Sequence, residues 1–270
     1  MAAVQLEILD YPQDTPNGPP IVFVHGAYVG AWCWQEHFLP WFSAHQRHVI
    51  ALSLEGHGES EGGMWSAMLG IDNYVQDLCQ VTEALTQPPI LIGHSMGGFV
   101  IQRYLELGHP AAGVVMLASV PGEGIGSSAL NMLTRSPDLL TALNLFQFDS
   151  KLFQPRLDQM KKLLFSDTMP VEALEKWMTQ IRPESQRAIL DMGLVGFFTP
   201  RSLADTPALV LGGGEDKIIG HSDVLMTAKR FGVSAEIMPN LGHMMMLDTE
   251  WEKVAQRIEN WLQAMFATTK

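Results

Sequence analysis

The sequence predicts an α/β protein built on a mostly parallel, twisted sheet flanked by helices. Short apolar runs alternate along the chain with segments of helical periodicity, and this alternation is typical of strands joined by crossover helices. Most of these runs are continuously apolar, which indicates strands that are buried on both faces. The 270 residues are enough for one large domain or for a domain with an inserted subdomain.

The expected strands can be placed in order along the chain. The first, over residues 4–9 (VQLEIL), alternates between apolar and polar residues and is expected to be half-exposed. Six further strands are expected at residues 21–26, 48–54, 89–95, 113–119, 208–214 and 234–239. Apolar residues at helical spacing predict helices over residues 71–85 and 251–265, and a further helix is expected directly after Ser95.

One region interrupts the alternation of strands and helices. Between residues 121 and 205 no strand is evident, and stretches rich in Leu, Met and Phe are separated by prolines. These stretches predict helices at residues 136–146, 156–165, 171–181 and 184–192. We therefore expect residues 1–120 and 206–270 to form the core domain, and residues 121–205 to form a helical cap, or lid, inserted over one edge of the sheet.

Composition limits the classes of function. The formal net charge is -12 and no basic stripe is visible, so a nucleic-acid partner is not expected. No stretch approaches the roughly 18 uninterrupted apolar residues of a membrane span, and no basic segment followed by an apolar one opens the chain. Cys33 and Cys79 do not make a disulfide framework. The expectation is a cytoplasmic protein without a transmembrane segment, and its oligomeric state is left open.

A candidate catalytic motif lies between an expected strand and the helix that follows it. Gly93-His94-Ser95-Met96-Gly97 matches G-x-S-x-G. Such a strand–Ser–helix turn is so sharp that the residues two before and two after the serine must be small. The turn exposes the serine hydroxyl beside a helix N-terminus, whose N–H groups point at the site. No Lys-Ser/Thr follows the glycines, so a phosphate-binding loop is not indicated. A turn that serves packing alone is the remaining alternative.

Candidate partners for Ser95 follow two later strands. A serine hydroxyl becomes nucleophilic when a histidine takes its proton, and the imidazole in turn needs a carboxylate to orient it. Asp216 follows the run ALVLGGGE and His243 follows SAEIMPNLG, which gives the chain order Ser…Asp…His. Glu215 and Glu123 are less favoured alternatives for the acid. The sequence therefore predicts a catalytic triad of Ser95, Asp216 and His243.

Other histidines are expected to serve structure. His94, next to the candidate nucleophile, is expected to pack or to form hydrogen bonds. His45 and His48 make an H-x-x-H pair without a supporting Cys, Asp or Glu, so we interpret them as surface residues. Neither a metal nor a cofactor is expected.

Together these motifs resemble those of the α/β-hydrolase superfamily, over essentially the whole chain. The resemblance rests on GHSMGG at the nucleophile elbow, LGGGEDKII at the acid loop and NLGHMMMLD at the histidine loop, and it implies the α/β-hydrolase fold. The segment HGAY is similar to the family's HG-x turn, which implies an oxyanion hole made by the backbone N–H groups of Ala27 and Met96. Many members of the superfamily carry the motif D-x-x-G-H-G-x-S, whereas this chain has SLEGHGES at residues 53–60. Ser53 thus replaces the usual Asp, and the contacts that hold this loop in place are expected to differ.

Single residues in the sequence favour some classes of hydrolase over others. HGAYVGAWCW resembles a stretch of plant methylesterases and hydroxynitrile lyases. The lyases carry a lysine after the catalytic histidine, where this chain has Met244, and this favours ester hydrolysis. A serine at position 95 argues against haloalkane dehalogenases and epoxide hydrolases, which use an aspartate there. Cofactor-free haloperoxidases or perhydrolases and carbon–carbon bond hydrolases share the triad and stay as alternatives. A non-catalytic ligand-binding protein with this fold is the alternative from another class.

The segments beside the expected oxyanion turn and triad are apolar. Tyr28, Trp32 and Met244 are therefore expected to contact substrate, with Trp34, Met245 and Met246 nearby. Because an unpaired buried charge is costly, an apolar lining favours an uncharged ligand. The sequence thus predicts a serine carboxylesterase for small hydrophobic esters, acting through a Ser95 acyl-enzyme. Substrate identity is not predicted.

Overall fold

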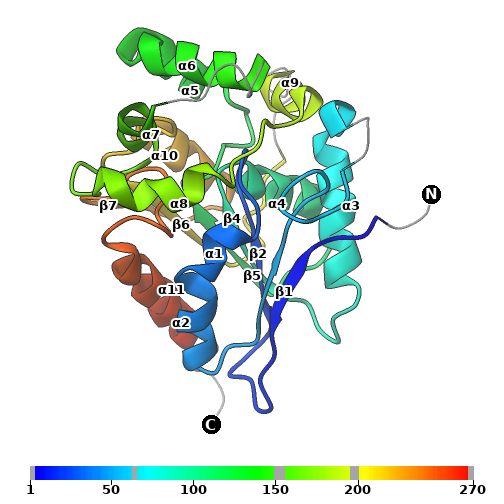
Figure 1. Ribbon diagram of the computed structural model, residues 1–270. Coiled ribbons are helices and arrows are strands. Elements are labelled where there is room, and N and C mark those ends of the chain that lie inside the picture. The colour runs from blue at the N-terminus through cyan, green and yellow to red at the C-terminus, as the bar shows by residue number, and fades with distance from the viewer. Residues whose placement is uncertain (1–3, 63–65, 149–155, 195–200, 267–270) are drawn as a thin grey trace.

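The computed structural model describes residues 4–62, 66–148, 156–194 and 201–266 (Figure 1). Two parts of the expected cap, residues 149–155 and 195–200, lie outside the described residues. No helix within the described ranges is long and apolar enough to cross a bilayer.

Seven strands form a single sheet in the spatial order β1-β3-β2-β4-β5-β6-β7. The edge strand β1 pairs antiparallel with β3, and every other pair of neighbours is parallel. The strands are β1 (Ile8–Tyr11), β2 (Ile21–Val24), β3 (Val49–Leu52), β4 (Ile90–His94), β5 (Gly113–Leu117), β6 (Ala208–Gly213) and β7 (Ala235–Met238). Strands β2 to β6 are buried along their whole length. The predicted mostly parallel sheet is confirmed, and so is the interpretation of its apolar runs.

The first strand lies later in the chain than the expected range of 4–9. Its ladder begins only at Ile8, opposite Leu52 at the end of β3. Residues before Ile8 extend past β3 and pair with the loop that follows it, as Ser53 N donates to Glu7 O at 3.0 Å. The Glu7 carboxylate also accepts from the Ser53 hydroxyl, which itself accepts from Ala31 N at 2.8 Å. Glu7 thus supplies a carboxylate to the loop in which Ser53 stands.

Helices cover both faces of the sheet. Figure 1 shows α2 and α11 together on one side, and α3 and α4 on the other. The helices of the core are α1 (Trp32–Gln35), α2 (Phe38–Ala44), α3 (Ile71–Thr82), α4 (Met96–Glu106), α10 (His221–Arg230) and α11 (Trp251–Phe266), with the short 3-10 helix η1 (Ser66–Met68) before α3. Because strands buried on both faces need cover on both, these helices complete the core.

The described residues between β5 and β6 form helices and no strand, and we call this segment the cap. Its elements are α5 (Gly126–Arg135), α6 (Pro137–Phe148), α7 (Leu157–Leu164), η2 (Val171–Leu174), α8 (Glu175–Met178) and α9 (Gln186–Leu194). Helix α5 was not expected, and the helix expected at 171–181 divides into η2 and α8. In Figure 1, α5, α6 and α9 lie at the top, beyond the ends of the strands. The division into a core domain and a cap domain remains our proposal.

Among the described residues, three buried carboxylates join the cap to the core. Each accepts hydrogen bonds from side chains of the other part, so that none of these buried carboxylates lacks hydrogen-bond donors. The contacts are Asp223 of α10 with Ser127 and Ser128 of α5, Asp248 with Ser166, and Glu184 with His57 and Tyr74.

Candidate active site

Ser95 occupies a strained turn between β4 and α4. Its φ is 52° and its ψ is -117°, a conformation that costs energy for a residue with a side chain. The turn is held from both sides, because Ser95 N donates to Leu117 O at 3.0 Å and Ser95 O accepts from Gly98 N at 3.1 Å. Ser95 is 8% exposed. The sequence G-x-S-x-G therefore forms the sharp strand–Ser–helix turn that it predicted.

Gly93 and Gly97 are required by close backbone contacts. A Cβ on Gly93 would lie 2.7 Å from Gly98 Cα, and a Cβ on Gly97 would lie 2.5 Å from His25 O and still nearer to Val24 O. Side chains do not approach backbone atoms so closely, so both positions need glycine if the turn is to form.

Asp216 and His243 meet at the same edge of the sheet. Asp216 follows β6, His243 follows β7, and His243 Nδ1 lies 2.8 Å from Asp216 Oδ2. The side chains are 0% and 5% exposed respectively. Because Nδ1–H donates to the carboxylate, Nε2 is the nitrogen left free to exchange a proton with a nucleophile.

The Asp216 carboxylate is itself fixed by the chain that follows it. Its other oxygen, Oδ1, accepts from Ile218 N at 2.8 Å and Ile219 N at 2.9 Å. Glu215 takes a different direction, and its Oε2 accepts from Asp167 N at 2.8 Å. The structure therefore places Asp216, rather than Glu215 or Glu123, against His243.

The loop that carries His243 is held by buried hydrogen bonds. His94 Nε2–H donates to His243 O at 3.0 Å, and Met244 N donates to Leu164 O of the cap at 2.8 Å. Asp248 Oδ2 accepts from Gly242 N at 2.8 Å. Burial and then the neighbouring His243 hold the pKa of His94 well below its usual value. His94 is therefore a neutral brace for the histidine loop, in agreement with the sequence-based expectation.

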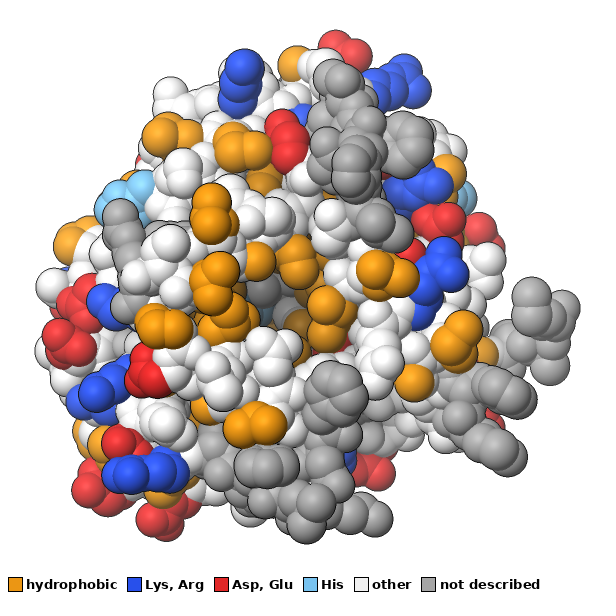
Figure 2. Space-filling view, turned by 90° about the horizontal axis from the view of Figure 1, so that it is seen from above, with side chains coloured by type: hydrophobic (Ala, Val, Ile, Leu, Met, Phe, Trp, Pro, Cys, Tyr) orange, Lys and Arg blue, Asp and Glu red, His pale blue; other side chains and the backbone are white. Residues whose placement is uncertain are grey.

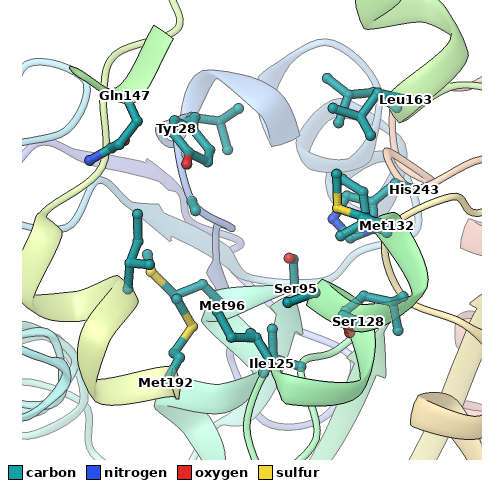
Figure 3. A pocket seen from close by; sticks show the side chains of 18 of the residues that line it. Tyr28, Ser95, Met96, Ile125, Ser128, Met132, Gln147, Leu163, Met192 and His243 are labelled. Atoms are coloured by element: carbon teal, nitrogen blue, oxygen red, sulfur yellow. The ribbon is translucent and has the colours of Figure 1, made fainter. Parts of the chain in front are cut away.

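Ser95 and His243 line one cavity of about 510 Å³ beneath the cap. Ala27 and Met96, the two expected oxyanion residues, line it as well. Met96 is the first residue of α4, and the first N–H groups of a helix have no acceptor within it. Figure 3 shows Ser95 at the floor of this cavity, with His243 to one side and Tyr28 to the other.

The cavity wall is mostly apolar, carries a few uncharged polar side chains, and comes largely from the cap. Among the described residues that line it there is no Lys, Arg, Asp or Glu. Cap side chains at the wall include Ile125, Met132, Leu163, Ile189 and Met192. Seen from above, apolar side chains gather around a hollow in the surface (Figure 2). The sequence did not single out these residues, and only the richness of the cap in Leu, Met and Phe indicated them.

Two of the three expected substrate contacts line the cavity, and one does not. Tyr28 and Met244 are at its wall. Trp32 is not among the lining residues, and it packs partly buried against the hydrophobic core. Trp34, Met245 and Met246 are 0% exposed and belong to the core. The expected contact of Trp32 with substrate is therefore corrected.

His45 and His48 do not line the cavity. His45 Nδ1 lies 2.8 Å from Trp41 O, and His48 Nε2 lies 2.7 Å from Asp10 Oδ1. Within the described ranges, no group of three or more His, Cys, Asp or Glu side chains is arranged to hold a metal ion.

Comparison with known proteins agrees with the fold. Residues 21–257 match the model of the Alpha/beta hydrolase family, and the chain belongs to that family. It is 36% identical over 108 residues to a non-heme chloroperoxidase of Streptomyces lividans, a match that covers 39% of this chain and 38% of that protein. It is 26% identical to the (E)-2-((N-methylformamido)methylene)succinate hydrolase of Acinetobacter baylyi, over 92% of this chain and 91% of that one.

A solved structure shows the same architecture. A thermophilic esterase from Thermogutta terrifontis superimposes with a TM-score of 0.74 at 20% identity, over 97% of this chain and 94% of that chain. Some curated relatives are similar to this chain over only part of their length. The chain spans 38% of the length of one and 31% of the length of another, or about a third.

Proposed function

We propose that this chain is a serine carboxylesterase that hydrolyses uncharged esters with an apolar acyl or alcohol group. The observation that supports the proposal most directly is that His243, held by the buried Asp216 side chain, lines the same cavity as Ser95. The apolar wall supports an uncharged substrate, because a charged group brought there would lose hydration without gaining a partner.

In the proposed reaction, Ser95 Oγ attacks the ester carbonyl carbon while His243 Nε2 takes the hydroxyl proton. Asp216 holds the imidazole in the required tautomer and stabilises the imidazolium. The N–H groups of Ala27 and Met96 donate to the oxyanion, and one such donor contributes roughly 3–4 kcal/mol of transition-state stabilisation. The protonated His243 then gives its proton to the departing alcohol. Water, deprotonated by His243, hydrolyses the acyl-enzyme and restores Ser95.

A series of p-nitrophenyl esters from acetate to decanoate tests the proposal. We expect the wild-type chain to hydrolyse them, and Ser95→Ala to lose at least about 10⁴-fold in kcat because the nucleophile is gone. Thioester and amide substrates in the same series define the leaving group. Unchanged ester hydrolysis by a folded Ser95→Ala variant would overturn the assignment.

A second candidate is suggested by the chloroperoxidase relative, which is 36% identical over 108 residues. Perhydrolysis would use the same acyl-enzyme, with hydrogen peroxide rather than water as the attacking group, and would form a peracid. Peracid formation from a carboxylic ester at low peroxide concentration, measured against ester hydrolysis, separates the two. A folded wild-type chain that binds neutral apolar ligands but turns over neither substrate would instead indicate a non-catalytic binding protein.

A further inference from the structure

The cap is attached to the core beside the cavity by a buried acid, Glu184, which lies between α8 and α9. Its side chain is 0% exposed. His57 Nε2 donates to Glu184 Oε2 at 2.9 Å, and the Tyr74 hydroxyl donates to Oε1 at 2.7 Å. Both donors belong to the core, whereas Glu184 belongs to the cap. The contact therefore ties the two parts together out of reach of solvent.

The geometry makes this contact an ion pair. His57 Nδ1 lies 3.1 Å from Glu55 O, and Nε2 faces the Glu184 carboxylate. Both ring nitrogens thus face oxygen acceptors, and only the imidazolium can donate to both. Burial lowers the pKa of His57, but the Glu184 charge and the hydrogen bonds raise it above its usual value. Burial raises the pKa of Glu184, but the charge and hydrogen bond of His57, together with the hydrogen bonds from Tyr74 and Ser185 N, bring this pKa below its usual value.

The backbone around Glu184 carries part of the cavity wall. Glu184 N donates to Gln147 Oε1 at 3.1 Å, and Gln147 Nε2 donates back to Glu184 O at 2.6 Å. Two residues earlier, Arg182 N donates to Tyr28 O at 3.0 Å. Gln147 and Tyr28 line the cavity, as do Ile181 and Gln186 on either side of Glu184. Figure 3 shows Gln147, Tyr28 and Met192 on the same side of Ser95, opposite His243.

We infer that Glu184 is a positioning residue for substrate specificity: its contacts with His57 and Tyr74 hold the α9 wall of the cavity in place over Ser95. This inference rests on the proposed esterase function. Glu184 does not line the cavity and is not needed for the chemical step. Glu184 acts by positioning Gln147, Gln186 and the apolar side chains of α9, so it affects the binding of substrates that are long enough to contact that wall. A short acyl group that stays near Ser95 does not depend on it.

The matched variants are Glu184→Gln and Glu36→Gln. The first keeps the side-chain volume but removes the buried charge. The second removes the partner of Lys176 in a cap–core ion pair that is partly exposed, with exposed fractions of 53% and 35%. Exposed pairs contribute little, so Glu36→Gln controls for the loss of a cap–core ion pair as such. Tyr74→Phe removes one donor to Glu184 and leaves the charges in place.

The test compares kcat and KM for p-nitrophenyl acetate and decanoate at neutral pH. For Glu184→Gln we expect the decanoate-to-acetate ratio of kcat/KM to fall about tenfold, mainly through a higher KM for decanoate. We expect a smaller change of the same kind for Tyr74→Phe and none for Glu36→Gln. An unchanged ratio in Glu184→Gln, or an equal loss with both esters, would overturn the inference.

A binding measurement keeps this test separate from that of the proposed function. In the Ser95→Ala background, the affinity for the neutral fluorophore N-phenyl-1-naphthylamine reports the cavity without turnover. We expect Glu184→Gln to weaken its binding several-fold and Glu36→Gln to leave it unchanged. If no ester is hydrolysed but this binding difference is found, the proposed reaction fails and the role of Glu184 stands. Equal binding in both variants would contradict that role.

Discussion

Asp216 Oδ2 and His243 Nδ1 lie 2.8 Å apart although the two residues are 27 positions apart in the chain. They meet because β6 and β7 are neighbouring parallel strands that end at the same edge of the sheet. Ser95 reaches that edge from β4, with β5 between it and β6. The topology of the sheet, rather than any local sequence, therefore brings the three residues to one place.

The Asp216–His243 contact predicts a large loss of activity in Asp216→Asn. The amide keeps the side-chain volume but turns an N–H group or a neutral oxygen toward His243 Nδ1. The tautomer of the His243 imidazole is then no longer fixed. We expect kcat to fall about 10³- to 10⁴-fold with little change in KM. Glu215→Gln is the control, because Glu215 binds Asp167 N instead. Equal losses in the two variants would show that the acid has been misassigned.

The tight turn predicts that Gly97→Ala is destabilising and inactive. The new methyl group would meet the carbonyl oxygens of Val24 and His25, and the backbone cannot move without displacing Ser95. We expect the free energy of unfolding to fall by about 2–3 kcal/mol, measured by chemical denaturation. Gly193→Ala is a matched control, since a Cβ at Gly193 in α9 meets nothing within 4 Å. A stable and active Gly97→Ala variant would disprove the steric argument.

Asp248 is expected to hold the histidine loop in place. Its two oxygens accept five hydrogen bonds, from Ser166 N and Oγ, Gly242 N, and Thr249 N and Oγ1. In Asp248→Asn the amide would place N–H groups against N–H donors, so we expect a loss of about 2–4 kcal/mol in the free energy of unfolding. Ser166→Ala removes a single donor and should cost about 1 kcal/mol. Similar losses in both variants would contradict the assigned role.

The Glu184–His57 ion pair predicts a pH window of stability. The pKa of Glu184 is lowered in the folded protein, so its contribution is present above its unfolded pKa and is lost as pH falls through the folded value. The pKa of His57 is raised, so its contribution is fully present below about 6.5 and is lost as pH rises through the folded value. The Tm difference between the wild type and Glu184→Gln should therefore be largest near about pH 6.

Other titratable groups face the Glu184–His57 pair, and they are present in both the wild type and the Glu184→Gln variant. They are His25, Glu55, Tyr74, Asp77 and Tyr28. Burial raises the pKa of Asp77 to about 6, so both proteins change stability in this range, and only their difference reports the ion pair. A Tm difference that is constant from pH 4 to pH 9 would contradict the ionic character of the contact.

The sequence predicted the features that depend on local sterics and strand order. Continuous apolar runs located the buried strands, and the glycines around Ser95 specified a turn that no larger residue can form. Asp216 and His243 were placed by their positions directly after strands. Such inferences succeed because parallel strands expose their carboxyl ends at one edge.

The features that the sequence did not predict depend on packing between distant segments. Nothing local distinguishes Glu184 from the other acids of the cap, because its partners His57 and Tyr74 are more than 100 residues away. Likewise, the four residues of α1 are too few to show from the sequence that Trp32 would not line the cavity. The cap side chains at the cavity wall could be identified only once α5, α7 and α9 were placed over Ser95.

Ser95 is proposed to be a nucleophile that His243 and Asp216 activate. The most direct measurement is labelling of the folded protein with a fluorophosphonate, followed by mass spectrometry of the modified peptide. We expect one equivalent of label on Ser95 of the wild type, and much slower labelling of His243→Gln and Asp216→Asn. Folded wild-type protein that stays unlabelled, or carries its label on another residue, would contradict the role of Ser95 as the nucleophile.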